Sequence, residues 1–440
     1  MRYVALTGSL GCGFREESLA AGVAAGPAFI GSDSGSTDGG PYYLGSGDWI
    51  WADAAYERDL RLGLAGARRA GVPLIIGSCG GGGGDDAVTG YLDLVERIAR
   101  GEGWRLRVAC VFCEPDRAVM KAKLLDGLLL PLPGAPAIES ATFDADGHIV
   151  AMAGAEQIEW ALATGADVVL VGRCADAAIY AAMPLAAGFE PASVWNAAKI
   201  AECGAAAAEN RSGQDSLLVT LDDDGFVLEP LDPALRCTPA SVAAHTLYEV
   251  SDPYRLVMPS GVLDSSAATY TALDDRRVRV TGGTWTPAER YTVKLEGSAP
   301  LGFLSGFWGT VRDPMLLLQL PQWCAAVEDR LRSRLKEVAS GDFQVQLRTF
   351  GGRDVEAVLV VDVVGQTQED ASAMARAAYH VALHWPIVGW SGGSVTTFAH
   401  PYSAPVVDRG PVYRFTLNHA MVLEGDEPET LFRTTVEEVG

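Results

Sequence analysis

Short apolar runs alternate with helical patterns over residues 1–210. The runs are rich in aliphatic and β-branched side chains and show no alternation, which is typical of strands that are buried on both faces. We expect strands at residues 3–7, 28–31, 74–77, 106–112 and 168–172, and helices at 52–70, 86–101, 115–125, 155–164, 176–182 and 194–208. Strands of this kind, joined by crossover helices, form a mainly parallel α/β sheet that is flanked by helices.

The pattern changes twice further along the chain. Residues 215–300 alternate strands and turns around one helix that begins near Pro239, which predicts a mixed α+β middle part. Residues 301–396 follow the order β-α-β-β-α-β of a ferredoxin-like split unit, and a wrapping tail comes after them. We therefore predict an α/β core domain at residues 1–300, and a smaller ferredoxin-like α+β domain with the C-terminal tail at 301–440.

Composition narrows the classes of partner and compartment. The 440 residues are 48% apolar and 20% charged, as in ordinary globular proteins, but the formal net charge is −22. Nucleic acids and anionic membrane surfaces repel such a field, so we expect neither as a partner.

No run is long enough to span a membrane, and no signal peptide is evident. The eight cysteines suggest reduced thiols in the cytoplasm, and Cys110 and Cys113 suggest buried thiols rather than zinc ligands.

Two glycine-rich loops follow predicted strands and indicate where a ligand binds. The first reads DSGSTDGG from residue 33, and the second reads GSCGGGGGDD from residue 77. Loops at the carboxyl edge of a parallel sheet are the usual place for a ligand site. The expected binding residues are Asp33, Ser34, Ser36, Thr37, Asp38 and Gly39 in the first loop, and Ser78, Gly80 and Gly81 in the second. Either loop could instead be a structural turn, with Asp85 and Asp86 favouring a helix N-terminus.

Two charged pairs follow in the same half of the chain. Arg173 and Asp176 lie between a strand and a helix, where the guanidinium could hold a carboxylate or could fix the loop by pairing with Asp176. Lys199 and Glu202 lie three residues apart on a mostly apolar helix. A buried lysine with a lowered pKa could act as a base or form a Schiff base, while a surface ion pair is the simpler alternative.

A third pair and one arginine complete the candidate residues. His245 and Glu249 lie four residues apart on a predicted helix, where they could move a proton or simply bond to each other. Arg312 precedes a helix and could close the ligand pocket. We assign no metal ligands and no cofactor, since no nicotinamide or flavin fingerprint is present. Magnesium or calcium held by Asp33, Asp38 or Asp85 is a weaker alternative.

Several long motifs resemble one family across nearly the whole chain. They include DSGSTDGGPYYLGSG, GSCGGGGG, GRCADAAIYAAMPL, KIAECGA, TPASVAAHTLYEVSDPY, PSGVLD and YRFTLNHAM, in that order. The chain is similar in these motifs to the acyclic terpene utilisation AtuA-like family, which the resemblance associates with bacterial catabolism. The resemblance implies an α/β body with a small C-terminal domain. Asn196 and Met258 depart from the family pattern, in which we expect a histidine and a glutamate, so the activity here could be altered.

These observations favour a cytoplasmic catabolic enzyme over other classes. Catalytic roles fall to Lys199, Glu202, His245 and Glu249, and this set suits a lyase, hydratase or isomerase. The expected substrate is a small organic acid or acyl derivative, such as a carboxylate or CoA thioester, and a homo-oligomer is expected. The alternative is a non-catalytic binding or assembly subunit that works with a partner protein.

Overall fold

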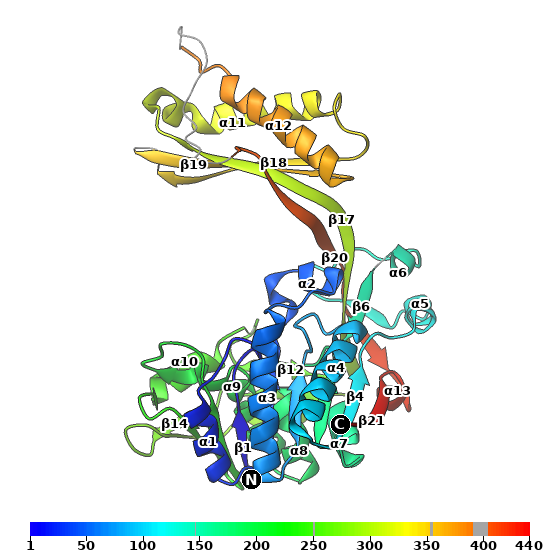
Figure 1. The fold of residues 1–440 in the computed structure, drawn as a ribbon, viewed down its shortest axis with the longest axis vertical. Coiled ribbons are helices and arrows are strands. Elements are labelled where there is room, and N and C mark those ends of the chain that lie inside the picture. Colours follow the sequence, from blue (N-terminus) through cyan, green and yellow to red (C-terminus); the bar gives the residue numbers. More distant parts are fainter. Residues whose placement is uncertain (146, 250, 353–354, 390–403) are drawn as a thin grey trace. The chain divides into compact units, whose positions relative to one another are not determined.

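A computed structural model describes the chain except for residues 146, 250, 353–354 and 390–403. The chain forms two compact units (Figure 1). Unit 1 comprises residues 1–299 and 415–440, and unit 2 comprises residues 300–414. Residues 415–440 therefore fold with the large unit and not with the small one, unlike in the division expected from the sequence. The reason is pairing, since β21 (Arg433–Val439) lies antiparallel to β4 (Leu106–Phe112).

The main sheet of unit 1 contains ten strands in the order β14-β15-β10-β9-β1-β2-β3-β7-β4-β21. The five consecutive strands from β1 to β4 in this order are parallel to one another. The remaining strands extend the sheet at both ends by antiparallel pairing. The bounds not yet given are β1 (Arg2–Ala5), β2 (Ile30–Asp33), β3 (Leu74–Gly77), β7 (Val168–Val171), β9 (Leu217–Asp222), β10 (Gly225–Pro230), β14 (Thr269–Ala272) and β15 (Val278–Thr281).

The parallel core follows the apolar runs of the sequence, and several strands of the mixed middle part continue the same sheet. Strands β9, β10, β14 and β15 join the same sheet because β9 pairs with β1 along its length. The fold is therefore mixed α/β with a large sheet that is parallel at its centre and antiparallel toward its edges.

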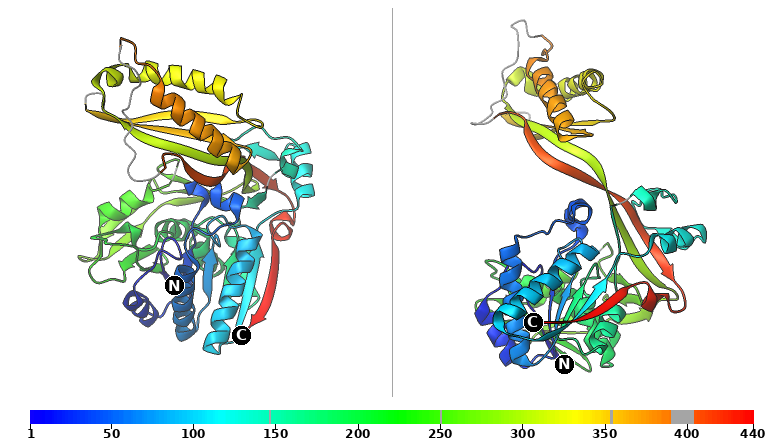
Figure 2. Two further views of the ribbon diagram at one scale, coloured as in Figure 1. Left: turned by 45° about the horizontal axis from the view of Figure 1, so that its top comes forward. Right: turned by 45° about the vertical axis from the view of Figure 1, so that its right-hand side comes forward.

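Alternating side chains of the parallel strands separate two apolar cores. Val4, Ile30 and Ile76 face a core shared with α1 (Glu16–Ala24), α3 (Asp53–Ala70) and α4 (Asp85–Glu102). Tyr3 and Ala5 face the opposite core, shared with α7 (Ala155–Ala163), α8 (Ala178–Ala186) and α9 (Pro191–Ala201). Figure 2 shows α3 and α4 side by side on one side of the strands. Both faces are thus covered, which explains the continuous apolar runs.

Shorter elements of unit 1 connect and cover the sheet. They are η1 (Thr37–Gly39), α2 (Tyr42–Ser46), α5 (Arg117–Leu125), β5 (Leu129–Pro131), α6 (Thr142–Ala145), β6 (His148–Ala151), η2 (Gly204–Ala207), β8 (Ala208–Glu209), β11 (Arg236–Cys237), α10 (Pro239–Thr246), β12 (Arg255–Met258), β13 (Gly261–Asp264), β16 (Thr284–Pro287) and α13 (Glu427–Thr430). Within the described residues, no helix combines the length and the apolar character that crossing a membrane requires.

Unit 2 follows the order β-α-β-β-α-β, but its last strand lies beyond residue 396, in the stretch that was expected to form a wrapping tail. Strand β17 (Tyr291–Val311) is followed by α11 (Pro314–Leu335), β18 (Gln344–Gly352), β19 (Glu356–Gly365), α12 (Gln368–His384) and β20 (Val407–Leu423). The strands lie in the order β18-β19-β17-β20, and α11 and α12 contribute to one apolar core with them. Strands β17 and β20 both begin in one unit and end in the other.

Candidate functional site

A pocket of about 530 Å³ lies at the carboxyl edge of the parallel strands of unit 1. The loops after β1 and β2, the segment after β7, the end of α9 and the residues around the end of α10 form its walls. The lining residues are Gly8, Ser9, Cys12, Asp33, Gly35, Ser36, Trp51, Asp176, Glu202, Cys203, Ala206, Arg211, Gln214, His245, Tyr248 and Glu249. Segments far apart in the sequence therefore meet at the edge where ligands bind in open α/β sheets.

Asp33 ends strand β2 and lies almost fully buried in the pocket wall, 3% exposed. Its Oδ2 accepts a hydrogen bond from the backbone N–H of Gly35 at 3.0 Å. Its Oδ1 is enclosed and has no hydrogen-bond partner within the described part of the chain. Burial and the nearby Asp176 carboxylate raise the pKa of Asp33 well above its ordinary value, although Arg173 opposes this. Gly35 has a φ of +118°, which a residue with a side chain would rarely adopt at this turn.

Arg173 is buried and its guanidinium is occupied by protein groups. Nε donates to Glu296 at 3.0 Å, and Nη1 donates to the Asp176 carboxylate and to Ser78 Oγ, each at 3.1 Å. Nη1 also donates to the carbonyl of Cys174 at 2.8 Å. The sequence allowed Arg173 either to hold a carboxylate ligand or to fix its loop by pairing with Asp176. The structure shows the second contact, between Arg173 and Asp176.

Lys199 and Glu202 form a buried ion pair at the C-terminal end of α9. Burial lowers the pKa of Lys199, but the Glu202 carboxylate more than offsets it, so that this pKa is raised overall. The sequence left two alternatives for Lys199, a free base with a lowered pKa or a surface ion pair; the structure shows an ion pair that is buried, in which the partner carboxylate outweighs desolvation. Lys199 itself is not among the residues that line the pocket, whereas its partner Glu202 is.

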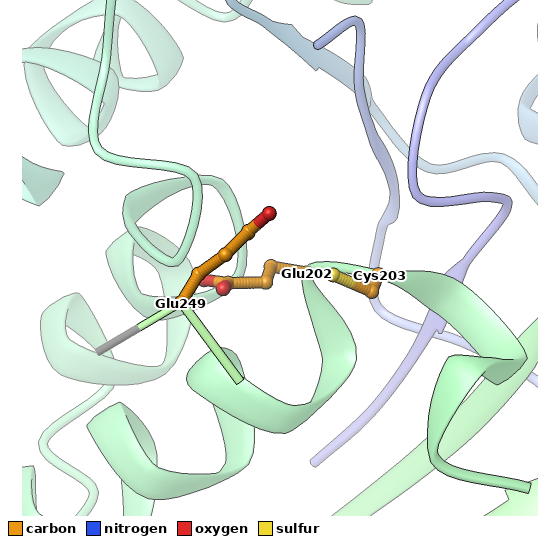
Figure 3. Close-up of side chains that lie close together, drawn as sticks. All are labelled: Glu202, Cys203 and Glu249. Atoms are coloured by element: carbon orange, nitrogen blue, oxygen red, sulfur yellow. The ribbon is translucent and has the colours of Figure 1, made fainter. Parts of the chain in front are cut away.

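Cys203 and Glu249 lie next to Glu202 (Figure 3). One oxygen each of Glu202 and Glu249 and the Cys203 Sγ all lie within 4.8 Å of one another. Cys203 directly follows Glu202. Its backbone packs closely against the segment after β1: a Cβ added to Gly8 would lie only 3.0 Å from the Cys203 Cα. Glu249 has a φ of +55°, an uncommon conformation for a residue with a long side chain.

His245 lies in α10, but this helix ends at Thr246. Glu249 is therefore beyond the helix, and the expected helical spacing of four residues from His245 does not exist. The His245 ring stacks on Tyr248 with the ring centroids 5.5 Å apart. Burial, aided by Lys199 and Arg211, lowers the pKa of His245 to about 4, which keeps the imidazole neutral near pH 7.

The second glycine-rich loop does not line this pocket. Ser78, Gly80 and Gly81 are buried, and a Cβ on Gly80 would contact the Trp49 side chain at 3.0 Å. Gly83 lies even closer to its neighbour, because a Cβ there would be 2.4 Å from the backbone nitrogen of Arg173. The structure thus places these glycines where the chain packs closely against itself.

Other predicted residues are distributed around the first loop. Thr37 and Asp38 line a second pocket of about 400 Å³ with Lys294 and Glu296, and Thr37 Oγ1 donates to Glu296 at 3.0 Å. Ser34 is fully buried and Gly39 is exposed.

Two further candidates lie outside the main pocket. Asp85 is not among the residues that line the main pocket. Its Oδ1 accepts hydrogen bonds from the backbone N–H groups of Cys113 and Glu114 at the end of β4. Arg312 belongs to unit 2, where it is exposed and pairs with Glu356 at 3.0 Å.

Some lining residues were not singled out from the sequence. They are Gly8, Ser9, Cys12, Gly35, Trp51, Cys203, Ala206, Arg211, Gln214 and Tyr248. Cys203 carried a signal, since a thiol next to the Lys199–Glu202 pair is unusual on an apolar helix. Asn196, on the same helix, is fully buried, and both polar atoms of its amide lack a hydrogen-bond partner among the residues that the structure describes.

Comparison with known proteins identifies one family. The sequence model of the acyclic terpene utilisation family protein AtuA matches residues 62–209 and 227–409. Neither the curated proteins nor the solved structures contain a significant match to the chain. The matched ranges include Lys199, Glu202, Cys203, His245 and Glu249, so the wall of the pocket that α9 and α10 supply lies within the family region.

Proposed function

Because the chain belongs to the acyclic terpene utilisation family AtuA, we propose that it is an enzyme in the breakdown of acyclic terpenes or related branched acyl compounds. The reaction is a proton-transfer reaction of the lyase, hydratase or isomerase type. One observation carries the proposal: Glu202, whose carboxylate pairs with the buried Lys199, and the neutral imidazole of His245 line one pocket at the carboxyl edge of the sheet. Such reactions need one group that donates a proton and another that accepts one.

The roles follow from the surroundings of each group. Lys199 pairs with Glu202 but is not itself among the residues that line the pocket, so its ammonium acts through this carboxylate and stabilises negative charge that develops on the substrate. His245 is kept neutral by burial and by the positive charge of Lys199, so it is the group that can accept a proton. Tyr248 stacks on the imidazole and fixes the plane of the ring.

The charge of the pocket indicates the kind of substrate. Among the described residues, its lining includes four carboxyl groups, Asp33, Asp176, Glu202 and Glu249, but only one guanidinium group, that of Arg211. Arg173, the cation expected to bind a carboxylate, is already bonded to Glu296 and Asp176. These charges favour an uncharged acyl group, such as the acyl end of a thioester, over a free carboxylate.

The test is turnover of a panel of branched, unsaturated acyl thioesters and hydroxy acids by the full chain. We expect at least one compound to be converted and to raise the melting temperature. Lys199→Met should then lower kcat/KM by about 10²- to 10⁴-fold. This change leaves the buried Glu202 carboxylate without its partner, which destabilises the fold. The double variant Lys199→Met/Glu202→Gln has no such unpaired charge, so it tests the loss of the lysine in a second protein.

The control variant is Lys121→Met, which removes an ammonium that pairs with the exposed Asp144 instead. It should leave turnover unchanged. A normal rate in a folded Lys199→Met chain would contradict the proposed role of the lysine. Thermal stabilisation by a compound that is never converted would favour a binding subunit instead.

A further inference from the structure

We propose that Glu202, Cys203 and Glu249 bind a divalent transition-metal cation in the wall of this pocket. The three potential ligand atoms lie within 4.8 Å of one another, close enough for one ion to contact all of them after small side-chain movements (Figure 3). They come from two segments, the end of α9 and the turn after α10, so that a cation would join these segments.

The donor set indicates the class of cation. A thiolate is a soft ligand that magnesium and calcium avoid, whereas zinc, cobalt and iron accept thiolate and carboxylate together. Three protein ligands leave at least one coordination position for water or substrate, as in catalytic rather than structural zinc sites. This set differs from the Asp33, Asp38 and Asp85 alternative that the sequence suggested.

A second observation points to a missing positive group in the same pocket. Asp33, which is 3% exposed, lines the pocket and has an enclosed Oδ1 without a hydrogen-bond partner in the part of the chain that the structure describes. Buried polar atoms are normally paired, so this oxygen indicates a partner in the pocket, such as a water molecule of a bound cation.

Neighbouring groups would orient the two carboxylate ligands. Lys199 donates to one oxygen of Glu202 and leaves the other oxygen available. The Tyr248 side chain hydrogen-bonds to Glu249. Partners of this kind fix the direction of metal-bound carboxylates and contribute to affinity.

The inference concerns the same pocket as the proposed function, but metal binding can be measured without a substrate. The purified full chain is treated with EDTA, dialysed and titrated with Co²⁺, and the titration is followed by absorption and by metal analysis. We expect one Co²⁺ per chain and a near-ultraviolet thiolate-to-cobalt charge-transfer band. Zn²⁺ should displace the Co²⁺ and abolish the band.

Three variants locate the ion. Cys203→Ser should remove the charge-transfer band, and Glu249→Gln should weaken binding at least about tenfold, as expected for loss of a group that holds the metal. Cys12→Ser is the matched control, because Cys12 lines the same pocket but lies outside the cluster. It should keep both the band and the affinity.

Three results would overturn the inference: no Co²⁺ binding, a band that survives in Cys203→Ser, or unchanged affinity in Glu249→Gln. Binding of Mg²⁺ without Co²⁺ or Zn²⁺ would also overturn it, since it would exclude the thiolate. A chain that binds Co²⁺ as expected but converts no acyl compound leaves this inference standing and contradicts only the proposed function.

Discussion

The two glycine-rich loops look alike in sequence but have different surroundings in the structure. Each follows a buried parallel strand, β2 in one case and β3 in the other. The first loop lines the pocket through Asp33, Gly35 and Ser36. The second is buried from Gly77 to Gly83, with its glycines in close contact with other segments. Glycine content at a sheet edge thus indicates only that the backbone approaches another segment closely. The acidic and hydroxyl residues between the glycines are what distinguish a loop that binds a ligand from a loop that packs against the protein.

The largest expected effect follows from a methyl group added to the packed loop. Gly83 has a φ of +71°, and a Cβ there would lie 2.4 Å from the backbone nitrogen of Arg173. Backbone atoms cannot move aside as a flexible side chain can, so Gly83→Ala should lower the free energy of unfolding by about 3 kcal/mol or more. Denaturant unfolding followed by circular dichroism measures this.

The matched control comes from the first loop. A Cβ on Gly39 would have no neighbour within 4 Å among the described residues, so Gly39→Ala should change stability by less than about 0.5 kcal/mol. Equal effects of the two substitutions would contradict the distinction between a packed and an open loop.

In the pocket, by contrast, we expect a substitution that raises the free energy of unfolding. Asp33 carries an ionisable oxygen that is buried without a partner among the described residues. Asp33→Asn should therefore raise the free energy of unfolding by about 1 kcal/mol and lower activity or ligand binding. Because the pKa of Asp33 is raised, the wild type loses stability as the pH increases through that pKa, and the advantage of the variant should grow with pH.

Thermal unfolding of both proteins between pH 5 and pH 8 provides the measurement. The comparison uses the metal-free chain, since a bound cation would compensate the charge of Asp33. A variant that is less stable than the wild type at every pH would show that the Asp33 carboxylate is a structural group.

The smallest effect concerns a pair beside the packed loop. His148 Nδ1 lies 2.8 Å from Glu114, and this hydrogen bond raises the pKa of His148. Stability from the charged pair is present below the ordinary histidine pKa and is lost as the pH rises through the raised pKa. The difference between wild type and His148→Gln should be roughly 1 kcal/mol or less at pH 6 and smaller at pH 9. A difference that increases toward pH 9 would contradict this account.

Local patterns predicted the parallel core but not how distant strands pair. Strands β3 and β4 match their apolar runs because both faces of each are buried. The addition of β9 beside β1 depends on partners that lie more than 200 residues apart in the chain, and no local pattern encodes such a partner. The same holds for β21, which the sequence assigned to a tail.

The site was predicted only in part, again because local patterns do not encode contacts between distant segments. Asp33, Asp176, Glu202, His245 and Glu249 were expected together and do line one pocket. Arg173 faces the protein interior because Glu296, a strand residue far along the chain, lies within reach of its guanidinium. Sequence patterns locate charged residues at a sheet edge, but the competition between partners is decided only in three dimensions.

The pairing of β21 with β4 also has a consequence for synthesis on the ribosome. Residues 433–439 emerge long after β4, so a nascent chain exposes the edge of a strand with the sequence LRVACVF throughout the translation of unit 2. An apolar, unpaired edge of this kind associates readily with other chains. The yield of native protein should therefore depend on chaperones that shield this edge until translation is finished.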